Sequence, residues 1–126
     1  MARLDGNFVG KGIAAGRVLY GLGCMAAPRT FVGPAGQRAE GQLVWMARAF
    51  GVRDVVLGAG TFLALREGGP AARRWVEVST AADGLDLVNA VVFRKELDTQ
   101  GVAATFALAL PATVGGWWAA RQLRPA

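Results

Sequence analysis

The sequence contains no histidine and a single cysteine, Cys24. Histidine is the commonest general base and metal ligand, so its absence removes the most frequent acid–base and metal chemistries. A lone cysteine cannot form an intramolecular disulfide or a cysteine-based metal cluster. The sequence also lacks a Ser/His/Asp set, a phosphate-binding loop and metal-ligand spacing. These absences favour a protein without enzymatic activity, although they leave that question open, and we expect no metal and no cofactor.

Charged residues are also scarce. They make up 18% of the 126 residues, and hydrophobic residues make up 53%, whereas soluble domains carry roughly 25% charged residues. Together with a mean hydropathy of +0.33 and 18 glycines, this favours a membrane protein, because membrane helices tolerate glycine. The net charge of +5 does not predict a nucleic-acid partner, because the basic residues lie near the ends of apolar segments. The expected partner is the lipid bilayer.

Four apolar segments, residues 8–27, 43–65, 72–93 and 102–120, are each close to the roughly 20 residues that a transmembrane helix needs. Proline and glycine separate the first three segments, and a charged turn precedes the fourth. The sequence therefore predicts one all-α domain over residues 1–126, a four-helix transmembrane bundle. Residues 102–120 carry no charge and give the strongest signal. Residues 72–93 are the least hydrophobic, so a soluble or peripheral bundle is the alternative.

The basic residues predict an orientation for four alternating spans. Seven of them fall on one side and four on the other; the seven are Arg3, Lys11, Arg66, Arg73, Arg74, Arg121 and Arg124, and the four are Arg29, Arg38, Arg94 and Lys95. Positive charge accumulates on the cytoplasmic side of a membrane. We therefore expect a multi-pass protein of the inner (plasma) membrane with both termini in the cytoplasm. Trp45, Trp75, Trp117 and Trp118 fall at the predicted interfaces.

Several charged residues fall inside the predicted spans, and five of them are candidates for a buried network: Arg17, Arg53, Asp54, Asp83 and Asp86, with Glu77 nearer a helix end. A charge near the bilayer centre costs about 2.5–3.5 kcal/mol on insertion scales, so these side chains are expected to face inward and to pair across helices. We expect Arg17 or Arg53 to pair with Asp83 or Asp86, with Asp54 joining from its own face. One interpretation is a structural network that fixes the helices in register. The other is a ligand or proton site, because three acids exceed two bases.

Helical spacing assigns faces to these segments. Five residues share one side of the second segment and form a small-residue face around an acid: Ala47, Gly51, Asp54, Gly58 and Thr61. A polar stripe follows the third segment: Ser79, Asp83, Asp86 and Asn89. The first segment contains Gly12-x-x-x-Gly16, a motif that permits close helix approach. Pro111 is expected to kink the fourth segment.

Three motifs carry a family resemblance: Arg17-Val18-Leu19-Tyr20-Gly21 with Ala27-Pro28, Arg48-x-x-Gly51-Val52-Arg53-Asp54-Val55-Val56-Leu57-Gly58, and Asp83-Gly84-Leu85-Asp86. Over about residues 11–93 the sequence resembles small uncharacterised four-helix membrane proteins of actinobacteria, and more loosely the DoxX-like membrane proteins. The resemblance implies the fold and the location, and it carries over no catalytic residue.

These observations lead to two functional hypotheses. The first is a non-enzymatic accessory or assembly component that packs through its glycine faces, as a homo-oligomer or against another membrane protein. The second is a small carrier or ligand-binding protein that uses the buried carboxylates. A membrane enzyme ranks below both, because the sequence offers no nucleophile–base pair.

Overall fold

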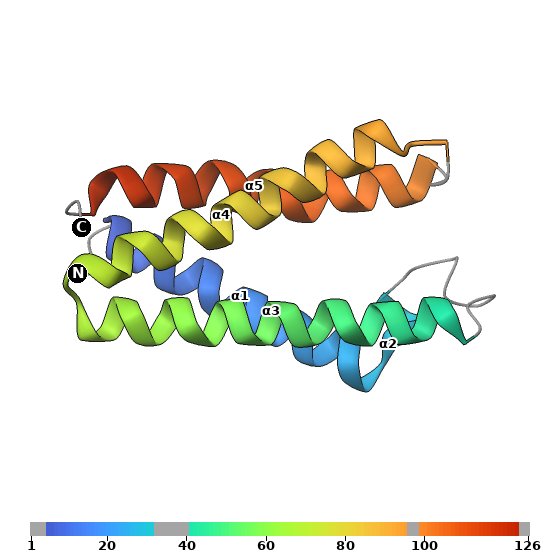
Figure 1. Ribbon diagram of the computed structural model, residues 1–126, viewed down its shortest axis with the longest axis horizontal. Helices are drawn as coiled ribbons and strands as arrows, with labels where there is room; N and C mark the ends of the chain where they lie inside the picture. The colour runs from blue at the N-terminus through green and yellow to red at the C-terminus, as the bar shows by residue number, and fades with distance from the viewer. Residues whose placement is uncertain (1–4, 32–40, 96–98, 124–126) are drawn as a thin grey trace.

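The computed structural model describes residues 5–31, 41–95 and 99–123. Over these ranges the chain is all-α, with four long helices and one short one (Figure 1). The helices are α1 (Gly6–Ala26), α2 (Pro28–Phe31), α3 (Gln42–Glu67), α4 (Pro70–Val92) and α5 (Thr99–Gln122). The four long helices run alternately up and down, so that α1 begins and α5 ends at the same end of the bundle.

The long helices begin and end close to the predicted positions, and the differences have local causes. Asp5 caps α1, because its carboxylate accepts a hydrogen bond of 2.8 Å from the Phe8 backbone amide. The turn between α3 and α4 is short, since Gly68 and Gly69 have φ of 75° and 82° and Pro70 starts the next helix. The expected break over residues 66–74 is therefore reduced to these two glycines.

Two further expectations about element boundaries are corrected. Residues 28–31 form the short helix α2, where the sequence predicted a loop. Thr99 and Gln100 belong to α5 rather than to the charged turn before it. The rest of the predicted loop after α2, residues 32–40, lies outside the described residues. Pro111 is contained within α5, which continues as one helix on both sides of it.

The helices associate as two consecutive pairs. α1 packs most extensively against α3, and α4 packs most extensively against α5, with less contact between the pairs. The α1–α3 contact depends on glycine: a Cβ on Gly21 would lie 2.6 Å from the Gly51 carbonyl oxygen, and one on Gly58 would lie 2.6 Å from the Ala14 carbonyl oxygen. The backbones can approach this closely because these positions have no side chain.

The motif Gly12-x-x-x-Gly16 was expected to permit close approach of another helix, but no other helix of this chain approaches α1 at these two positions. Gly12 and Gly16 have no heavy atom of another segment within 4 Å of a built Cβ. The close approach of α1 to α3 instead uses Gly21, on another face of the same helix. The prediction for α3 is confirmed, because its small-residue face is buried: Ala47, Gly51, Asp54, Gly58 and Thr61.

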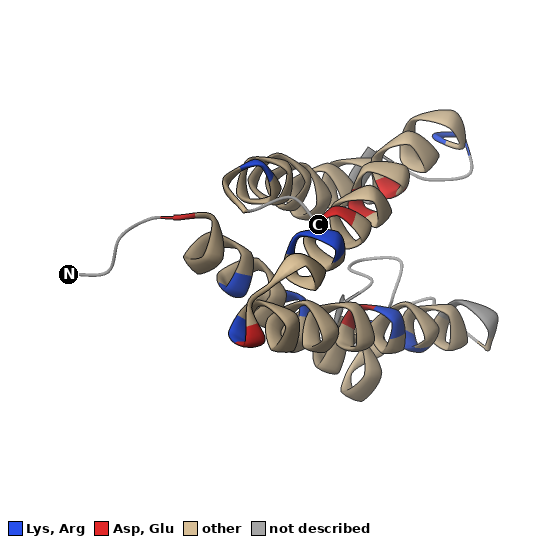
Figure 2. Ribbon diagram, turned by 60° about the vertical axis from the view of Figure 1, so that its left-hand side comes forward, with Lys and Arg blue, Asp and Glu red and all other residues tan. Residues whose placement is uncertain are grey.

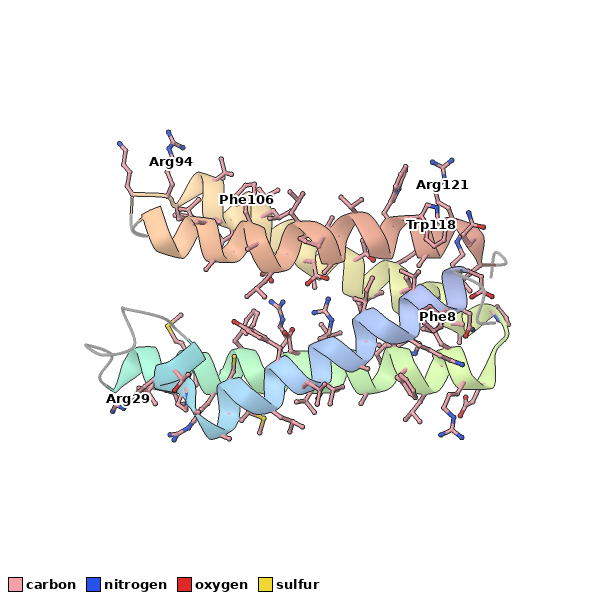
Figure 3. All side chains as sticks on the ribbon, turned by 180° about the vertical axis from the view of Figure 1, so that it is seen from behind. Phe8, Arg29, Arg94, Phe106, Trp118 and Arg121 are labelled. Carbon is pink, nitrogen blue, oxygen red and sulfur yellow. The ribbon has the colours of Figure 1, made fainter. Side chains whose placement is uncertain are left out.

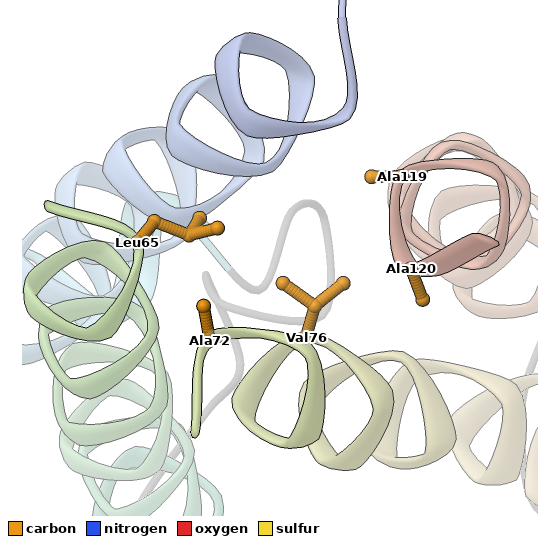
Figure 4. Packing of buried hydrophobic residues seen from close by; sticks show 5 residues of the cluster. All are labelled: Leu65, Ala72, Val76, Ala119 and Ala120. Atoms are coloured by element: carbon orange, nitrogen blue, oxygen red, sulfur yellow. The ribbon is translucent and has the colours of Figure 1, made fainter. Parts of the chain in front are cut away.

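An apolar cluster joins the two helix pairs at the end where α1 begins. It contains Leu65 of α3, Ala72 and Val76 of α4, and Ala119 and Ala120 of α5. Leu65, Val76 and Ala119 turn toward a common centre (Figure 4). All five are at most 4% exposed. Because three of the five are alanines, the interior at this end is built from small side chains.

Large apolar side chains lie on the outside of the bundle, and a few charged side chains are buried in a mainly apolar interior. Leu19 is 70% exposed, Leu85 67% and Val92 60%. The buried polar residues include Arg17, Asp54 and Asp83. On α4 the polar stripe is buried at Ser79 and Asp83, intermediate at Asp86 and exposed at Asn89. Of the large apolar residues of this helix, Val76 is buried, whereas Leu85, Val88, Val91 and Val92 are exposed. Figure 3 shows apolar side chains projecting outward along the helices.

One helix of the described chain, Val102–Gln122, is long and apolar enough to cross a membrane, with a hydropathy of 1.3. Only 17% of its apolar stretch is buried inside the bundle, whereas the core helix of a soluble protein is mostly buried. The structure therefore supports one span from length and composition alone.

Candidate functional site: a buried arginine–aspartate network

The five charged residues predicted from the sequence lie close together between the helices. α1 contributes Arg17, α3 contributes Arg53 and Asp54, and α4 contributes Asp83 and Asp86. Figure 2 shows the charged positions of α3 and α4 on ribbons that are otherwise mostly uncharged. The ion pairs form a continuous chain in space, from Asp83 through Arg17, Asp54 and Arg53 to Asp86. Asp54 connects the group around Arg17 with the group around Arg53.

Arg17 occupies the buried centre of this network. Its Nη1 donates to Asp54 Oδ1 over 2.9 Å, and its Nη2 donates to Asp83 Oδ2. Nη2 also donates to the Ser79 carbonyl oxygen over 3.4 Å. The forked guanidinium can serve several acceptors in fixed directions, which the single ammonium of lysine cannot do. One side chain of α1 thus holds both α3 and α4.

Arg53 forms the outer part of the network. It makes two parallel hydrogen bonds to Asp86, of 3.2 and 2.7 Å, and its Nη2 lies 3.8 Å from Asp54 Oδ1. Its guanidinium also lies 4.6 Å from the centre of the Phe50 ring, within range of a cation–π interaction. The side chains of Arg53 and Asp86 are 36% and 27% exposed, so this pair is more open than the pairs of Arg17.

A narrow cleft adjoins Arg17 and Asp83, and all four long helices line it. The cleft is small: its cavity volume is about 10 Å³, close to the minimum that one water molecule needs. Gly10 and Ala14 of α1 and Ala112 and Gly116 of α5 leave this space unfilled. Gly116 is required here, because a Cβ at that position would collide with Thr80 Oγ1.

The surface of the cleft is mainly apolar, and three hydroxyl residues of α3 and α4 contribute to its lining. Thr61 Oγ1 and Ser79 Oγ share a hydrogen bond of 2.8 Å, and Thr80 Oγ1 donates to the Val76 carbonyl oxygen over 2.7 Å. The sequence predicted inward-facing positions for Thr61 and Ser79. It did not predict that α5 would line the cleft. The small residues Ala112 and Gly116, four positions apart, are the signal that could have identified it.

The chemistry of the site follows from these groups. Among the described residues, no group of three or more histidine, cysteine, aspartate or glutamate side chains could hold a metal ion. Cys24 is buried and unoxidised, and a cysteine of this kind more often serves as a small apolar residue than as a nucleophile. The arrangement can hold helices together through charge, and it can accept a small polar or cationic species beside Asp83.

The network contains two arginines and three aspartates, so its side chains carry one negative charge in excess when all are ionised. The structure thus brings together the residues that the sequence singled out, and it specifies which acid each arginine contacts. No family model matches the chain, and no curated protein and no solved structure match it either.

Proposed function

We propose that this chain is a multi-pass integral membrane protein in which α1, α3, α4 and α5 all cross the bilayer. The observation that carries the proposal is the apolar outer surface of the bundle together with the charged groups buried inside it. Leu19, Leu85 and Val92 present apolar surface outward, while Arg17 and Asp83 are 7% and 6% exposed. In water this arrangement would expose apolar surface on every long helix, whereas in lipid it places each group in a favourable solvent.

Five of the twelve charged residues that lower the hydropathy of α1, α3 and α4 belong to the network, and the other seven include residues near the helix ends. α1 carries Arg17, α3 carries Arg53 and Asp54, and α4 carries Asp83 and Asp86. A hydropathy value averaged along a helix counts each of these charged residues as if its side chain faced lipid. Paired and turned inward, they no longer oppose insertion to that extent. This supports four spans, although only α5 passes on composition alone.

The ends of the bundle favour the orientation with cytoplasmic termini. α1 begins and α5 ends at one end (Figure 1), where the Arg121 guanidinium lies 4.8 Å from the Trp117 ring. Arg29 and Arg94 lie at the other end (Figure 3). A tryptophan beside an arginine at a helix end is typical of a membrane interface. The larger number of basic residues on the side of the termini supports a cytoplasmic location for that side.

Two measurements test this architecture. Membranes from cells expressing the full chain are washed with alkaline carbonate, and a reporter active only in the cytoplasm is fused after Ala126 or inserted within residues 33–37. We expect the protein to stay in the pellet, with the first fusion active and the second inactive. Release by carbonate would overturn the membrane location, and an inactive C-terminal fusion would overturn the orientation alone.

Within the membrane, the role that the site supports best is that of an accessory or assembly component. The network joins α1, α3 and α4 without presenting a nucleophile–base pair. Gly12 and Gly16 lie on the outer surface with no neighbour within 4 Å of a built Cβ, so another helix can approach α1 closely there. This face offers a packing surface to a second copy or to another membrane protein.

A crosslinking experiment tests the role of this face. Gly16→Cys is introduced with Cys24→Ala, so that the new thiol is the only one in the chain. Val56→Cys on the exposed surface of α3 is the matched control. If copies pack through α1, oxidation in native membranes links Gly16→Cys chains and not Val56→Cys chains. Equal crosslinking of the two variants would contradict packing through the Gly12 and Gly16 face. A crosslinked product between this chain and another membrane protein would identify that protein, rather than a second copy, as the partner.

The cleft beside Asp83 favours a second candidate function, a small carrier or ligand-binding protein. Its hydroxyl groups and carboxylate converge at one place in an otherwise apolar surround. Replacing Asp83 by asparagine separates the two roles. A chain that folds and assembles normally but loses a ligand- or proton-dependent signal would favour the carrier over the accessory component.

A further inference from the structure

The starting point is the charge of the interior. Arg17 is 7% exposed, and its two carboxylate partners, Asp54 and Asp83, are 5% and 6% exposed. Arg53 and Asp86 balance each other through two hydrogen bonds. One negative charge is therefore left over in the most buried part of the network, where an uncompensated charge is most unfavourable.

Asp83 is the acid with the least compensation. Asp54 lies 2.9 Å from Arg17 and 3.8 Å from Arg53, so two cations face it. Asp86 has Arg53 largely to itself and is partly exposed. Asp83 shares Arg17 with Asp54, and among the described residues no other arginine forms an ion pair with it.

Of the three acids of the network, only Asp83 lines the cleft, and its partner Arg17 lines it too. Asp83, Thr61, Ser79 and Thr80 line it together. Carboxylate and hydroxyl oxygens are the ligands that hard cations prefer. From α5 the cleft receives Ala112 and Gly116, which bring no charge. Tyr20 and Cys24 of α1 interact electrostatically with Asp54 rather than lining the cleft.

We propose that the cleft binds one monovalent cation at Asp83, either a proton on the carboxylate or a sodium ion held by Asp83 with the hydroxyls of Thr61 and Ser79. Either species supplies the missing positive charge and makes the five-residue network electrically neutral. This inference rests on the proposed membrane location, because the apolar surround is what makes the excess charge unfavourable. It assigns a ligand class to the second of the two functions above.

The first test is a pair of titrations on the full chain purified in a mild nonionic detergent. Thermal unfolding and tryptophan fluorescence are followed as pH is varied in choline chloride, and as sodium replaces choline at constant pH and ionic strength. A proton site predicts a one-site response to pH alone. A sodium site predicts a one-site response to sodium that weakens as the pH falls, because protons compete for Asp83. No response in either titration would overturn the proposal.

Variants assign the response to Asp83. Asp83→Asn keeps the shape of the side chain and removes its charge, so we expect a folded protein in which both responses are lost. Glu77→Gln is the control on the same helix, since Glu77 is half exposed and pairs with Arg73, and it should titrate like the wild type. Thr61→Val should abolish a sodium response and leave a proton response. A response that persists in Asp83→Asn would overturn the assignment.

A second measurement on the unmodified chain covers the case in which Asp83→Asn does not fold. A lipophilic carbodiimide reacts with carboxyl groups that hold a proton in an apolar surround, and mass spectrometry identifies the labelled residue. We expect Asp83 to be labelled, with labelling reduced by raising the pH for a proton site or by adding sodium for a sodium site. Labelling at Asp54 or Asp86 instead, or none at all, would overturn the proposal. Release of the protein by carbonate would instead contradict the membrane location, so the two failures are distinguishable.

Discussion

The strongest prediction concerns Arg17→Leu, which removes the buried centre of the network. The substitution eliminates the pairs with Asp54 and Asp83 and the hydrogen bond to the Ser79 carbonyl oxygen. Leucine fills part of the same volume but leaves two carboxylates in the interior without this partner. Breaking a buried ion pair by removing one member typically costs about 3–5 kcal/mol. We expect Arg17→Leu to destabilise the folded state by an amount in that range.

The same substitution at two other arginines provides an internal scale. Arg53→Leu breaks the pair with Asp86, whose side chains are 36% and 27% exposed, so its cost lies between the buried and surface cases, about 1–3 kcal/mol. Arg73→Leu breaks an exposed pair with Glu77 within one helix, for which about 0–1 kcal/mol is expected. Burial places the loss at Arg17 first, and Arg53 ranks above Arg73 because it makes two hydrogen bonds between helices rather than one within a helix. This order does not depend on the absolute values.

The assay is reversible unfolding in mixed micelles of a nonionic detergent and SDS, followed by tryptophan fluorescence. All three variants are measured at one pH and one salt concentration, so that differences reflect the substitution alone. Equal losses for Arg17→Leu and Arg73→Leu would refute the buried network. A large loss for Arg17→Leu that high salt removes would also refute it, because buried pairs are screened much less than exposed ones.

Two further predictions follow from the ion pairs and the helix contacts. Arg53→Leu combined with Asp86→Leu should recover part of the stability lost in Arg53→Leu alone, because no unpaired carboxylate remains at the outer pair; a double variant less stable than the single one would contradict this pairing. Gly51→Ala should lower the midpoint of SDS unfolding by the equivalent of about 1–3 kcal/mol, because its Cβ would lie 2.5 Å from a carbonyl oxygen of α1, whereas Gly16→Ala should be neutral or stabilising.

The sequence was sufficient to predict the long helices and the inward faces of α3 and α4. Helical spacing placed Asp54 with the small residues of α3, and Ser79 with Asp83 on α4, and these residues are buried. The need to compensate charge in an apolar surround was enough to group the five charged residues. Both arguments use only the period of the helix and the solvation of ions, so they hold without knowledge of how the helices are arranged.

Other features depend on the arrangement of the helices and could not be read from a single helix. Gly12-x-x-x-Gly16 and Gly21 are equally compatible with close packing, and only the relative rotation of α1 and α3 selects Gly21. The choice of Asp54 and Asp83 as partners of Arg17 likewise depends on the heights at which three helices meet. The short helix α2 begins at Pro28, in a stretch where we expected proline to separate two helices, because proline is also favoured in the first turn of a helix.

The division into two helix pairs has a consequence for biosynthesis. The first pair, α1 with α3, contains Arg17, Arg53 and Asp54 of the network, a net charge of +1; α4 contributes Asp83 and Asp86 to the second pair, a net charge of −2. Under the membrane location proposed above, the first pair would enter the bilayer before its acidic partners are synthesised. Opposite charges in a medium of low dielectric constant attract over long distances. The network charges of the two halves would then draw the halves together in the plane of the membrane, with the positive group inserted first.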